Sequence, residues 1–190
     1  MRSIFVSGSA FALVVLLAAS ASATPAAGPI VSPSNGHSYY LLNATSWTDA
    51  EAQSVALGGH LATIRNQTEQ AWVFGTFGHY AGQDRSLLIG LNDTAQKFTW
   101  AWTSGEPVPY TNWVVHQPDN NTYHDPRGQD YVMMVRTGNS YGEGAGGWND
   151  IENALAWWEF SPYNGVAEVL PEPSTLVLLM LAATVRGMWR

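Results

Sequence analysis

The sequence predicts one α+β domain, because two helix-like segments come first and several short strand-like segments follow them. A run of helices followed by a run of strands is typical of α+β proteins, whereas α/β proteins alternate the two. The chain has 190 residues and a hydrophobic fraction of 46%. That length suits one domain with appendages, and that fraction allows a packed core, which excludes global disorder.

The first helix is expected to begin at Ser46, where two capping-box spacings overlap. Ser46 is followed three residues later by Asp49, and Thr48 by Glu51. In such a box the hydroxyl accepts from a free backbone amide, and the acidic side chain three residues on accepts from the amide of the hydroxyl residue. The helix should end at Gly58, because glycine adopts a positive φ at little cost.

The second helix is expected to begin after Asn66, with Glu69 three residues on, and to end at Gly75 and Gly78. The strand-like segments are recognised by apolar runs or by alternation with period two. They are His37–Leu42, Leu87–Leu91, Phe98–Trp102, Tyr131–Val135 and Ala156–Phe160, and His60–Ile64 is a short connection or a strand.

Composition excludes several classes of function. The chain has 8 Lys and Arg against 15 Asp and Glu, for a net charge of −7, so no basic patch is available and nucleic acid is not an expected partner. It contains no Cys, which excludes a disulfide scaffold, a thiolate metal site and a thiol nucleophile.

The N-terminal segment is typical of a secretory signal peptide at residues 1–23. Arg2 supplies the positive start, residues 4–19 are mostly apolar or small, and Ala21-Ser22-Ala23 offers a cleavage site. An uncleaved membrane anchor is the alternative. Residues 24–36, rich in Pro, Ala, Gly and Ser, are expected to be a flexible lead-in.

The C-terminal segment, residues 171–190, combines Pro171-Glu172-Pro173, the apolar run 176–185 and the basic residues Arg186 and Arg190. It resembles the PEP-CTERM sorting signal. The resemblance implies exosortase processing in a Gram-negative bacterium, transient membrane association, and export to the cell surface or to an extracellular biofilm matrix. A single tail anchor is the alternative, since ten apolar residues are short for a bilayer. The folded domain is then residues 37–170.

The strongest chemical signal is the pair of tripeptides Gln117-Pro118-Asp119 and Trp148-Asn149-Asp150. Gln117 and Asn149 offer amide oxygens, and Asp119 and Asp150 offer carboxylates. Such hard oxygen donors suit Ca²⁺, which takes about six to eight of them. A cis bond before Pro118, which costs little for proline, would turn its two neighbours toward one point.

Two vicinal hydroxyls of a sugar can complete the shell of such an ion. Each hydroxyl then donates to one ligand oxygen and accepts from one amide N–H. The order Gln117 then Asp119 sets the polarity of these hydrogen bonds, and a Glu-then-Asn order would reverse it. The order therefore discriminates sugar stereochemistry.

Several further segments appear in an order that resembles the C-type lectin domain over about residues 36–160. Each segment is weakly specific by itself, whereas their shared order is highly specific. They are Trp47-x-x-Ala50, Gly58-Gly59-His60-Leu61-Ala62-Thr63-Ile64, Leu88-Ile89-Gly90-Leu91-Asn92-Asp93, Phe98-x-Trp100, Ser104-Gly105-Glu106-Pro107, Tyr110-x-Asn112-Trp113, Gln117-Pro118-Asp119, Gln129-Asp130-Tyr131-Val132, Trp148-Asn149-Asp150 and Trp158-Glu159-Phe160.

The resemblance implies an α+β C-type lectin-like fold with two helices, two small antiparallel sheets and a long irregular ligand-binding loop region. It implies Gln117, Asp119, Asn149 and Asp150 as ligands of a sugar-binding Ca²⁺, without enzymatic chemistry. The Gln-Pro-Asp triplet is the version associated with galactose-type sugars, and Tyr123 is the nearest aromatic residue that could stack on the sugar.

The chain departs from the family pattern at several positions. Ser54, Tyr131, Asn153 and Trp158 stand where Cys is usual, so packing of the many tryptophans must replace the disulfides. The family's additional acidic metal ligand falls on Gln129, and the sequence does not choose among three acidic substitutes: Asp125, Asp130 and Glu143.

The sequence therefore predicts an exported carbohydrate-binding protein that recognises a galactose-type glycan or exopolysaccharide through Ca²⁺. The alternative is a lectin-fold adhesion or matrix protein that binds protein partners without sugar. The pattern Gly142-x-Gly144-x-x-Gly147 formally matches a dinucleotide fingerprint, but it leads into Trp148-Asn149-Asp150 and not into a helix.

Overall fold

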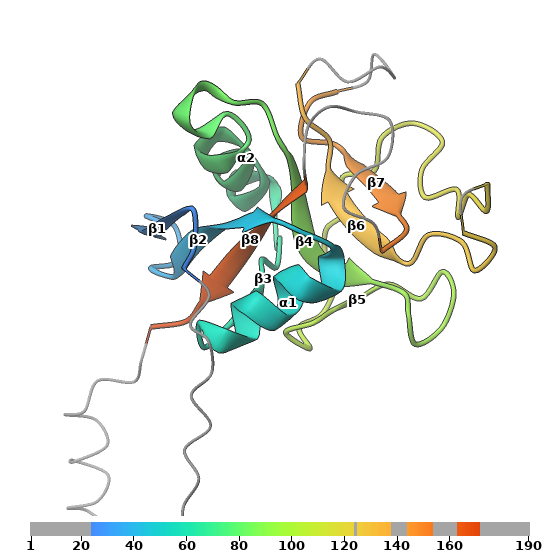
Figure 1. The fold of residues 1–190 in the computed structure, drawn as a ribbon, viewed down its shortest axis with the longest axis horizontal. Helices are drawn as coiled ribbons and strands as arrows, with labels where there is room; N and C mark the ends of the chain where they lie inside the picture. Colours follow the sequence, from blue (N-terminus) through green and yellow to red (C-terminus); the bar gives the residue numbers. More distant parts are fainter. Residues whose placement is uncertain (1–23, 124, 138–143, 154–162, 172–190) are drawn as a thin grey trace, which may run out of the picture.

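The computed structural model describes residues 24–123, 125–137, 144–153 and 163–171 (Figure 1). None of the helices in these ranges has the length and apolar character needed to cross a membrane. The elements, in chain order, are β1 (Ala27–Val31), β2 (Ser38–Ala44), α1 (Trp47–Ala56), β3 (His60–Leu61), α2 (Gln67–Phe77), a 3-10 turn (Tyr80–Gly82), β4 (Ser86–Asn92), β5 (Ala101–Trp102), β6 (Tyr131–Met134), β7 (Trp148–Ile151) and β8 (Tyr163–Val169).

The α+β prediction is confirmed, with one difference in the sheet. The strands join in the order β1-β2-β8-β4-β6-β7, with β3 added to β8 and β5 to β4, so they form one mixed sheet and not two separate antiparallel ones. The parallel pairing of β4 with β8, from Ser86 opposite Tyr163 to Leu88 opposite Gly165, joins the two halves. No local pattern predicts this pairing, because it links segments far apart in the chain.

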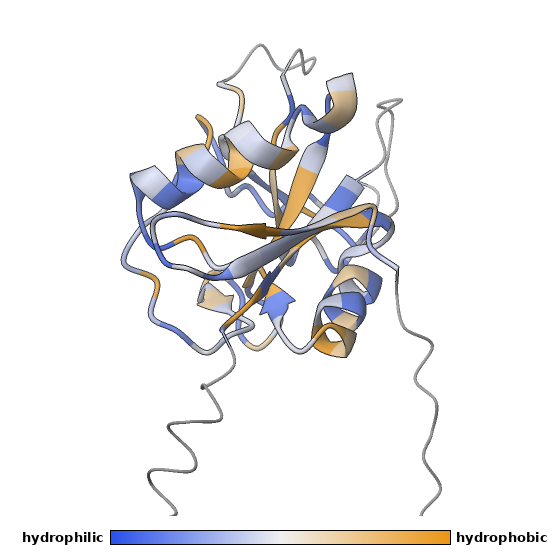
Figure 2. Ribbon diagram, turned by 90° about the vertical axis from the view of Figure 1, so that its left-hand side faces the viewer, coloured by the Kyte–Doolittle hydropathy of each residue, from blue (hydrophilic) through white to orange (hydrophobic). Residues whose placement is uncertain are grey.

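The helices lie on opposite faces of the sheet (Figures 1 and 2). Strand residues alternate between two hydrophobic clusters, as the period of two requires. On β6, for example, Val132 and Met134 pack in the cluster that includes Val73 of α2, whereas Met133 packs in the cluster that includes Trp47 of α1. The sheet is thus buried from both sides, and its loops are left to carry the site.

Both predicted helix starts are confirmed. The Ser46 side chain accepts from the Asp49 amide at the start of α1, and the Asn66 side chain accepts from the Glu69 amide at the start of α2. Of the two glycines expected to end the second helix, Gly78 is confirmed as the C-cap, whereas Gly75 lies inside α2, which continues to Phe77. Val73 and Phe77 are buried on either side of Gly75, and their packing outweighs the roughly 1 kcal/mol that a helical glycine costs.

Two strand predictions need correction. Residues 27–31, inside the expected flexible lead-in, form β1 and pair with β2. Of the expected strand Phe98–Trp102, only Ala101–Trp102 forms. Phe98 instead adopts a φ of +62° and donates its amide to Asp93 Oδ2 at 2.6 Å, because the chain turns there. The turn ends the period-two pattern.

The other strand predictions divide into those found, those missed and one outside the described residues. The strands expected at 37–42, 87–91 and 131–135 correspond to β2, β4 and β6. β7 and β8 were missed, and the expected strand at 156–160 lies outside the described residues. β7 is only four residues long and its sequence, Trp-Asn-Asp-Ile, carries two residues that are rare in strands.

Polar and aromatic contacts occupy three of the positions where the family usually has Cys. Tyr131 packs its ring against Trp47 with centroids 4.5 Å apart. Asn153 accepts from the Thr48 amide and donates to the Thr48 hydroxyl, and buried Ser54 donates to the carbonyl of Ala50. The fourth position, Trp158, lies outside the described residues.

Trp148 is the centre of the aromatic packing beneath the loops. Its fully buried ring contacts Trp102, Tyr110 and Trp113 edge-on, with centroids 5.7 to 5.8 Å apart. Its indole N–H donates to Gln70 Oε1 of α2 at 2.8 Å. Gln70 also donates to the carbonyl of Gly146 at 2.7 Å, so one side chain of α2 fixes the start of β7.

We predict that Gln70→Met destabilises the fold by about 1–3 kcal/mol, because it leaves the buried Trp148 indole N–H without a partner. Urea unfolding followed by tryptophan fluorescence measures the change. The control is Gln67→Met, whose exposed residue on the same helix accepts only from the Tyr110 hydroxyl in the described contacts. Equal stability of the two variants would contradict a stabilising role for the hydrogen bond between Gln70 and Trp148.

Candidate functional site

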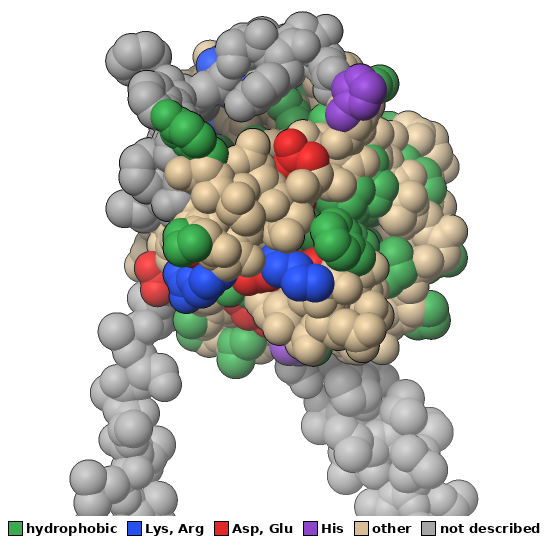
Figure 3. Space-filling view, turned by 90° about the vertical axis from the view of Figure 1, so that its right-hand side faces the viewer, with side chains coloured by type: hydrophobic (Ala, Val, Ile, Leu, Met, Phe, Trp, Pro, Cys, Tyr) green, Lys and Arg blue, Asp and Glu red, His purple; other side chains and the backbone are tan. Residues whose placement is uncertain are grey.

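The loops that enter β6 and β7 form the face shown in Figure 3. Basic and acidic side chains lie side by side in the lower part of this face, and most of the surrounding surface is uncharged. Backbone hydrogen bonds hold the loop between β5 and β6 against the edge strand β7. Trp148 donates its amide to the carbonyl of Asn112 at 2.7 Å, and Val114 donates to the carbonyl of Trp148 at 2.9 Å.

This edge pairing brings the predicted tripeptide Gln117-Pro118-Asp119 close to β7. The Gln117–Pro118 bond is cis. His116 and Asn120, on either side of the tripeptide, have φ of +68° and +49°. Such left-handed backbone is uncommon for residues other than glycine and is found where the surrounding structure enforces it.

The two predicted tripeptides meet through Asp150. The carboxylate of Asp150 is fully buried and accepts from the backbone amides of Asp119 at 3.1 Å and Asn120 at 2.8 Å, one at each oxygen. The Asp119 amide also lies 3.1 Å from Gln117 Oε1. Three of the predicted ligands are therefore joined, although 31 residues separate Asp119 from Asp150.

Gln129 lies in the same network. The amide of Asn121 donates to both Asp119 Oδ1 and Gln129 Oε1, each at 3.1 Å, so these two oxygens converge on one N–H. Gln129 Nε2 donates in turn to Glu152 Oε2 at 3.4 Å. Glu152 was not among the residues predicted from the sequence. Its position two residues after Asp150 could have indicated that it lies near the site.

Asn149, the remaining predicted ligand, has a side-chain oxygen that is buried and has no hydrogen-bond partner among the described residues. An unsatisfied buried oxygen costs about 1–3 kcal/mol. Asn149 directly precedes Asp150 on β7, so its buried oxygen is a further candidate donor for a cation. Amide and carboxylate oxygens, without nitrogen or sulfur ligands, are the set that calcium prefers.

The described residues contain no group of three or more His, Cys, Asp or Glu side chains placed to hold a metal ion. The predicted set differs from such a group because it mixes two carboxylates with three amides. The ligand roles of Gln117, Asp119, Gln129, Asn149 and Asp150 therefore stay predictions, and the structure contributes the contacts that bring four of them together.

Burial raises the pKa of Asp150, and the nearby charge of Asp119 acts in the same direction. The amides of Asn120 and Asp119 oppose this by stabilising the ionised carboxylate. Asp119 is exposed, whereas the buried carboxylate of Asp150 is costly without a counter-charge. A divalent cation at this position would supply that charge.

Two of the three acidic residues left open by the sequence already have cationic partners. Arg127 pairs with Asp125 at 2.7 Å, and its hydrogen bonds lower the pKa of Asp125 to about 2. Lys97 pairs with Asp130 at 2.5 Å. The third, Glu143, lies outside the described residues.

Tyr123, the predicted stacking residue, is 83% exposed on the same loop, and its amide donates to Asn121 Oδ1 at 2.8 Å. Its ring is accessible to a ligand in solution. The structure does not place the ring against the predicted ligands, so its stacking role also stays a prediction.

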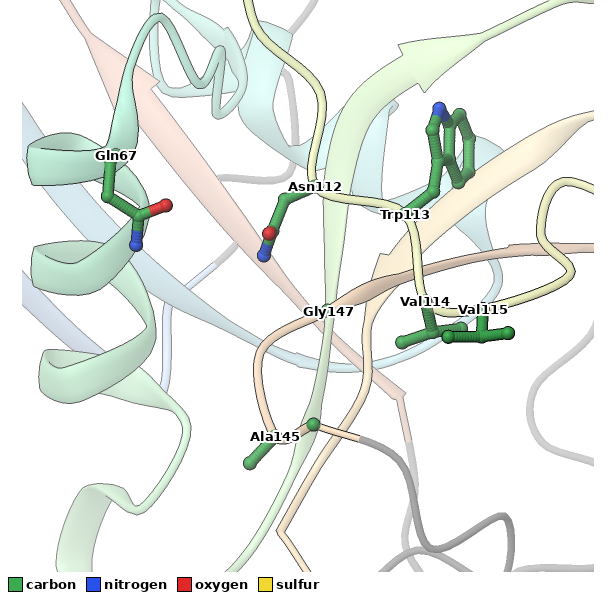
Figure 4. Close-up of a pocket in the computed structure, with 8 residues that line it drawn as sticks. Gln67, Asn112, Trp113, Val114, Val115, Ala145 and Gly147 are labelled. Atoms are coloured by element: carbon green, nitrogen blue, oxygen red, sulfur yellow. The ribbon is translucent and has the colours of Figure 1, made fainter.

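A separate hollow of about 460 Å³ opens between the start of α2 and the edge of β7. Gln67 and Asn112 project toward one another across it, and Trp113 and Ala145 also contribute to its lining (Figure 4). None of the predicted ligands lines this hollow.

Two helices on a mixed sheet, with irregular loops gathered at one edge, define a C-type lectin-like fold. Residues 43–152 match the family of the Lectin C-type domain, and the chain therefore belongs to that family.

Relatives of known description share only part of their length with this chain. The galactose-specific lectin nattectin of Thalassophryne nattereri is 35% identical over 75 residues, which are 40% of this chain and 47% of nattectin. C-type mannose receptor 2 of Mus musculus is 32% identical over 111 residues, which are 58% of this chain but only 7% of the receptor. The C-type lectin CEL-I from Cucumaria echinata superposes with a TM-score of 0.56 at 28% identity, over 70% of this chain and 89% of CEL-I.

We predict that, in a calcium chelator, the protein loses stability as the pH rises from about 4 through the raised pKa of Asp150. In that range the folded state keeps a proton that the unfolded state has released, so stability falls with rising pH. The melting temperature of Asp150→Asn relative to wild type should accordingly increase with pH. A constant difference across pH 4–8 would contradict the burial argument.

Proposed function

We propose that the protein binds galactose-type sugars through a calcium ion held by Gln117, Asp119, Gln129, Asn149 and Asp150. The observation that carries the proposal is the contact of buried Asp150 with the Asp119 and Asn120 amides. Asn149, the residue before Asp150, adds a buried oxygen without a hydrogen-bond partner among the described residues. This arrangement collects oxygen donors from two distant segments at the loop-bearing edge of the sheet.

Within this site the carboxylates of Asp119 and Asp150 supply the negative charge, and the amide oxygens of Gln117, Gln129 and Asn149 complete the protein ligands. A bound calcium ion supplies open coordination positions for two sugar hydroxyls. The side-chain amides and carboxylates then serve both ion and sugar, because each ligand oxygen has a second lone pair and each amide an N–H.

The galactose preference rests on the order Gln117 then Asp119, which places the amide donor first and the carboxylate acceptor second. Exposed Tyr123 would offer a flat face to the apolar side of the sugar ring. Nattectin, one of the relatives, is described as galactose-specific. The same chemistry extends to galactose-containing exopolysaccharides.

A second candidate is an adhesion or matrix protein that uses the lectin fold to bind protein partners without sugar. It is favoured by one observation: Asp125 and Asp130 are already paired with cations, so neither carboxylate is free to serve as the additional acidic ligand. Under this candidate, neither calcium nor galactose changes the behaviour of the protein.

We further propose that the protein is exported and sorted to the surface or matrix of a Gram-negative bacterium, with transient membrane association through residues 171–190. The support is the sequence of the two ends alone. Fractionation of cells that express the full chain, with and without residues 171–190, tests this point.

We predict calcium-dependent retention of the protein on galactose-agarose and its release by EDTA, because the sugar hydroxyls bind through the ion. Asp119→Asn should lower the affinity for calcium by about tenfold or more, since a charged ligand contributes at least about 1.4 kcal/mol. Isothermal titration with calcium measures this. Retention in EDTA, or affinity unchanged by the substitution, would favour the second candidate.

The matched control is Asp84→Asn, whose side chain pairs with His79 in the loop before β4. It should bind calcium and galactose as the wild type does. The double variant Gln117→Glu/Asp119→Asn reverses the order of donor and acceptor, so retention on galactose-agarose should be lost while calcium still binds.

A further inference from the structure

Lys97 places a positive charge at the meeting point of three segments beside the proposed calcium site. Its Nζ lies 2.5 Å from Asp130 Oδ1, 2.8 Å from Asn120 Oδ1 and 3.2 Å from the carbonyl oxygen of Gln129. A fourth oxygen, Asp93 Oδ1, lies 3.8 Å away. The ammonium group thus occupies a cage of oxygens of the kind that otherwise surrounds a metal ion.

The cage needs a cation because Asp93 is buried there. The Asp93 side chain is only 1% exposed, and its Oδ1 is buried without a hydrogen-bond partner in the described part of the chain. Burial raises the pKa of Asp93, whereas the charge of Lys97 lowers it. Lys97 is the cation that the structure places against both Asp93 and Asp130.

Asn120 connects this cage directly to the proposed calcium site. Its backbone amide donates to Asp150 Oδ2 at 2.8 Å, and its side-chain oxygen accepts from Lys97 Nζ at 2.8 Å and from the Gln129 amide at 2.9 Å. Gly128 packs against this side chain so closely that an added Cβ would lie 2.0 Å from Asn120 Oδ1. The 117–130 loop is therefore closed by contacts of the Asn120 side chain, near one end of the loop, with Gly128 and Gln129 near the other end.

We propose that Lys97 is a positioning residue whose ammonium group acts as a built-in cation and holds the 117–130 loop in its binding conformation before calcium arrives. The part of this proposal that concerns calcium affinity rests on the proposed function. The part that concerns the loop does not, because the contacts of Lys97 exist without the ion.

The energetic consequence is preorganisation. When an ion must order a loop on binding, the free-energy cost of ordering that loop weakens the affinity. When the loop is already ordered, this cost is absent. With Lys97 in place, the cage needs no second ion, and calcium is required at one position only.

The first test compares wild type and Lys97→Met in EDTA by amide hydrogen exchange. The amides of Asn120 and Gln129 should exchange at least about tenfold faster in the variant, because both are held by the closed loop. The calcium affinity should fall by about tenfold as well. Exchange equal to that of the wild type would overturn the proposal, whatever the calcium result.

The control is Arg127→Met, which removes a cation from the same loop but outside the cage, where the guanidinium pairs only with Asp125 in the described contacts. Its Asn120 and Gln129 amides should exchange as in the wild type. Equal effects of the two substitutions would mean that net charge, and not the cage, orders the loop, and would also overturn the proposal.

The second test is Lys97→Glu, which would put a third carboxylate among the oxygens of Asp93, Asn120, Gln129 and Asp130. If the cage is built for a cation, the variant should bind one calcium ion more than the wild type in equilibrium dialysis and should melt at higher temperature with calcium than without. The same number of ions in both proteins would contradict the cage.

The two proposals fail in distinguishable ways. If wild type binds no calcium, the proposed function fails, but the exchange measured in EDTA and the one-ion difference for Lys97→Glu still decide the role of Lys97. If wild type binds calcium and galactose while Lys97→Met exchanges normally, the function stands and the role of Lys97 falls.

Discussion

The buried carboxylate of Asp150 accepts amide hydrogens from Asp119 and Asn120, and the geometry of the site depends on this bridge. It joins the 117–130 loop to strand β7, since Asp150 lies on β7 and its partners follow the cis peptide bond of Gln117–Pro118. Burying a carboxylate is costly unless hydrogen bonds or a counter-charge compensate. The amides compensate in part, and a cation would complete the compensation.

The strand that carries Asp150 is itself held by aromatic packing and by one glutamine. Trp148 is enclosed by three aromatic rings, and Gln70 ties its indole to α2. Tyr131 and Asn153, at positions where the resemblance to the C-type lectin domain implies cysteines, instead contact Trp47 and Thr48. The aromatic contacts around Trp148 are buried, whereas the contact of Asn153 with Thr48 lies at the surface.

Charge is arranged on the loops so that most carboxylates have a local partner. Arg127 neutralises Asp125, and Lys97 neutralises Asp130 and faces Asp93. Asp119 and Asp150 differ from these because the described contacts give Asp150 two amides and no basic side chain. The negative charge that is left for a metal ion is therefore concentrated at one place, although the chain as a whole is acidic.

Helix starts, the α+β class and the two oxygen-bearing tripeptides could be predicted before any coordinates, because caps, periodicity and side-chain chemistry are local properties. Ser46 and Asn66 cap the helices as their spacing predicted. The parallel pairing of β4 with β8, the turn at Phe98 and the contacts of Lys97 with Asn120 and Asp130 became visible only in the folded chain. These features depend on contacts between segments distant in the chain, whose partners no local pattern encodes.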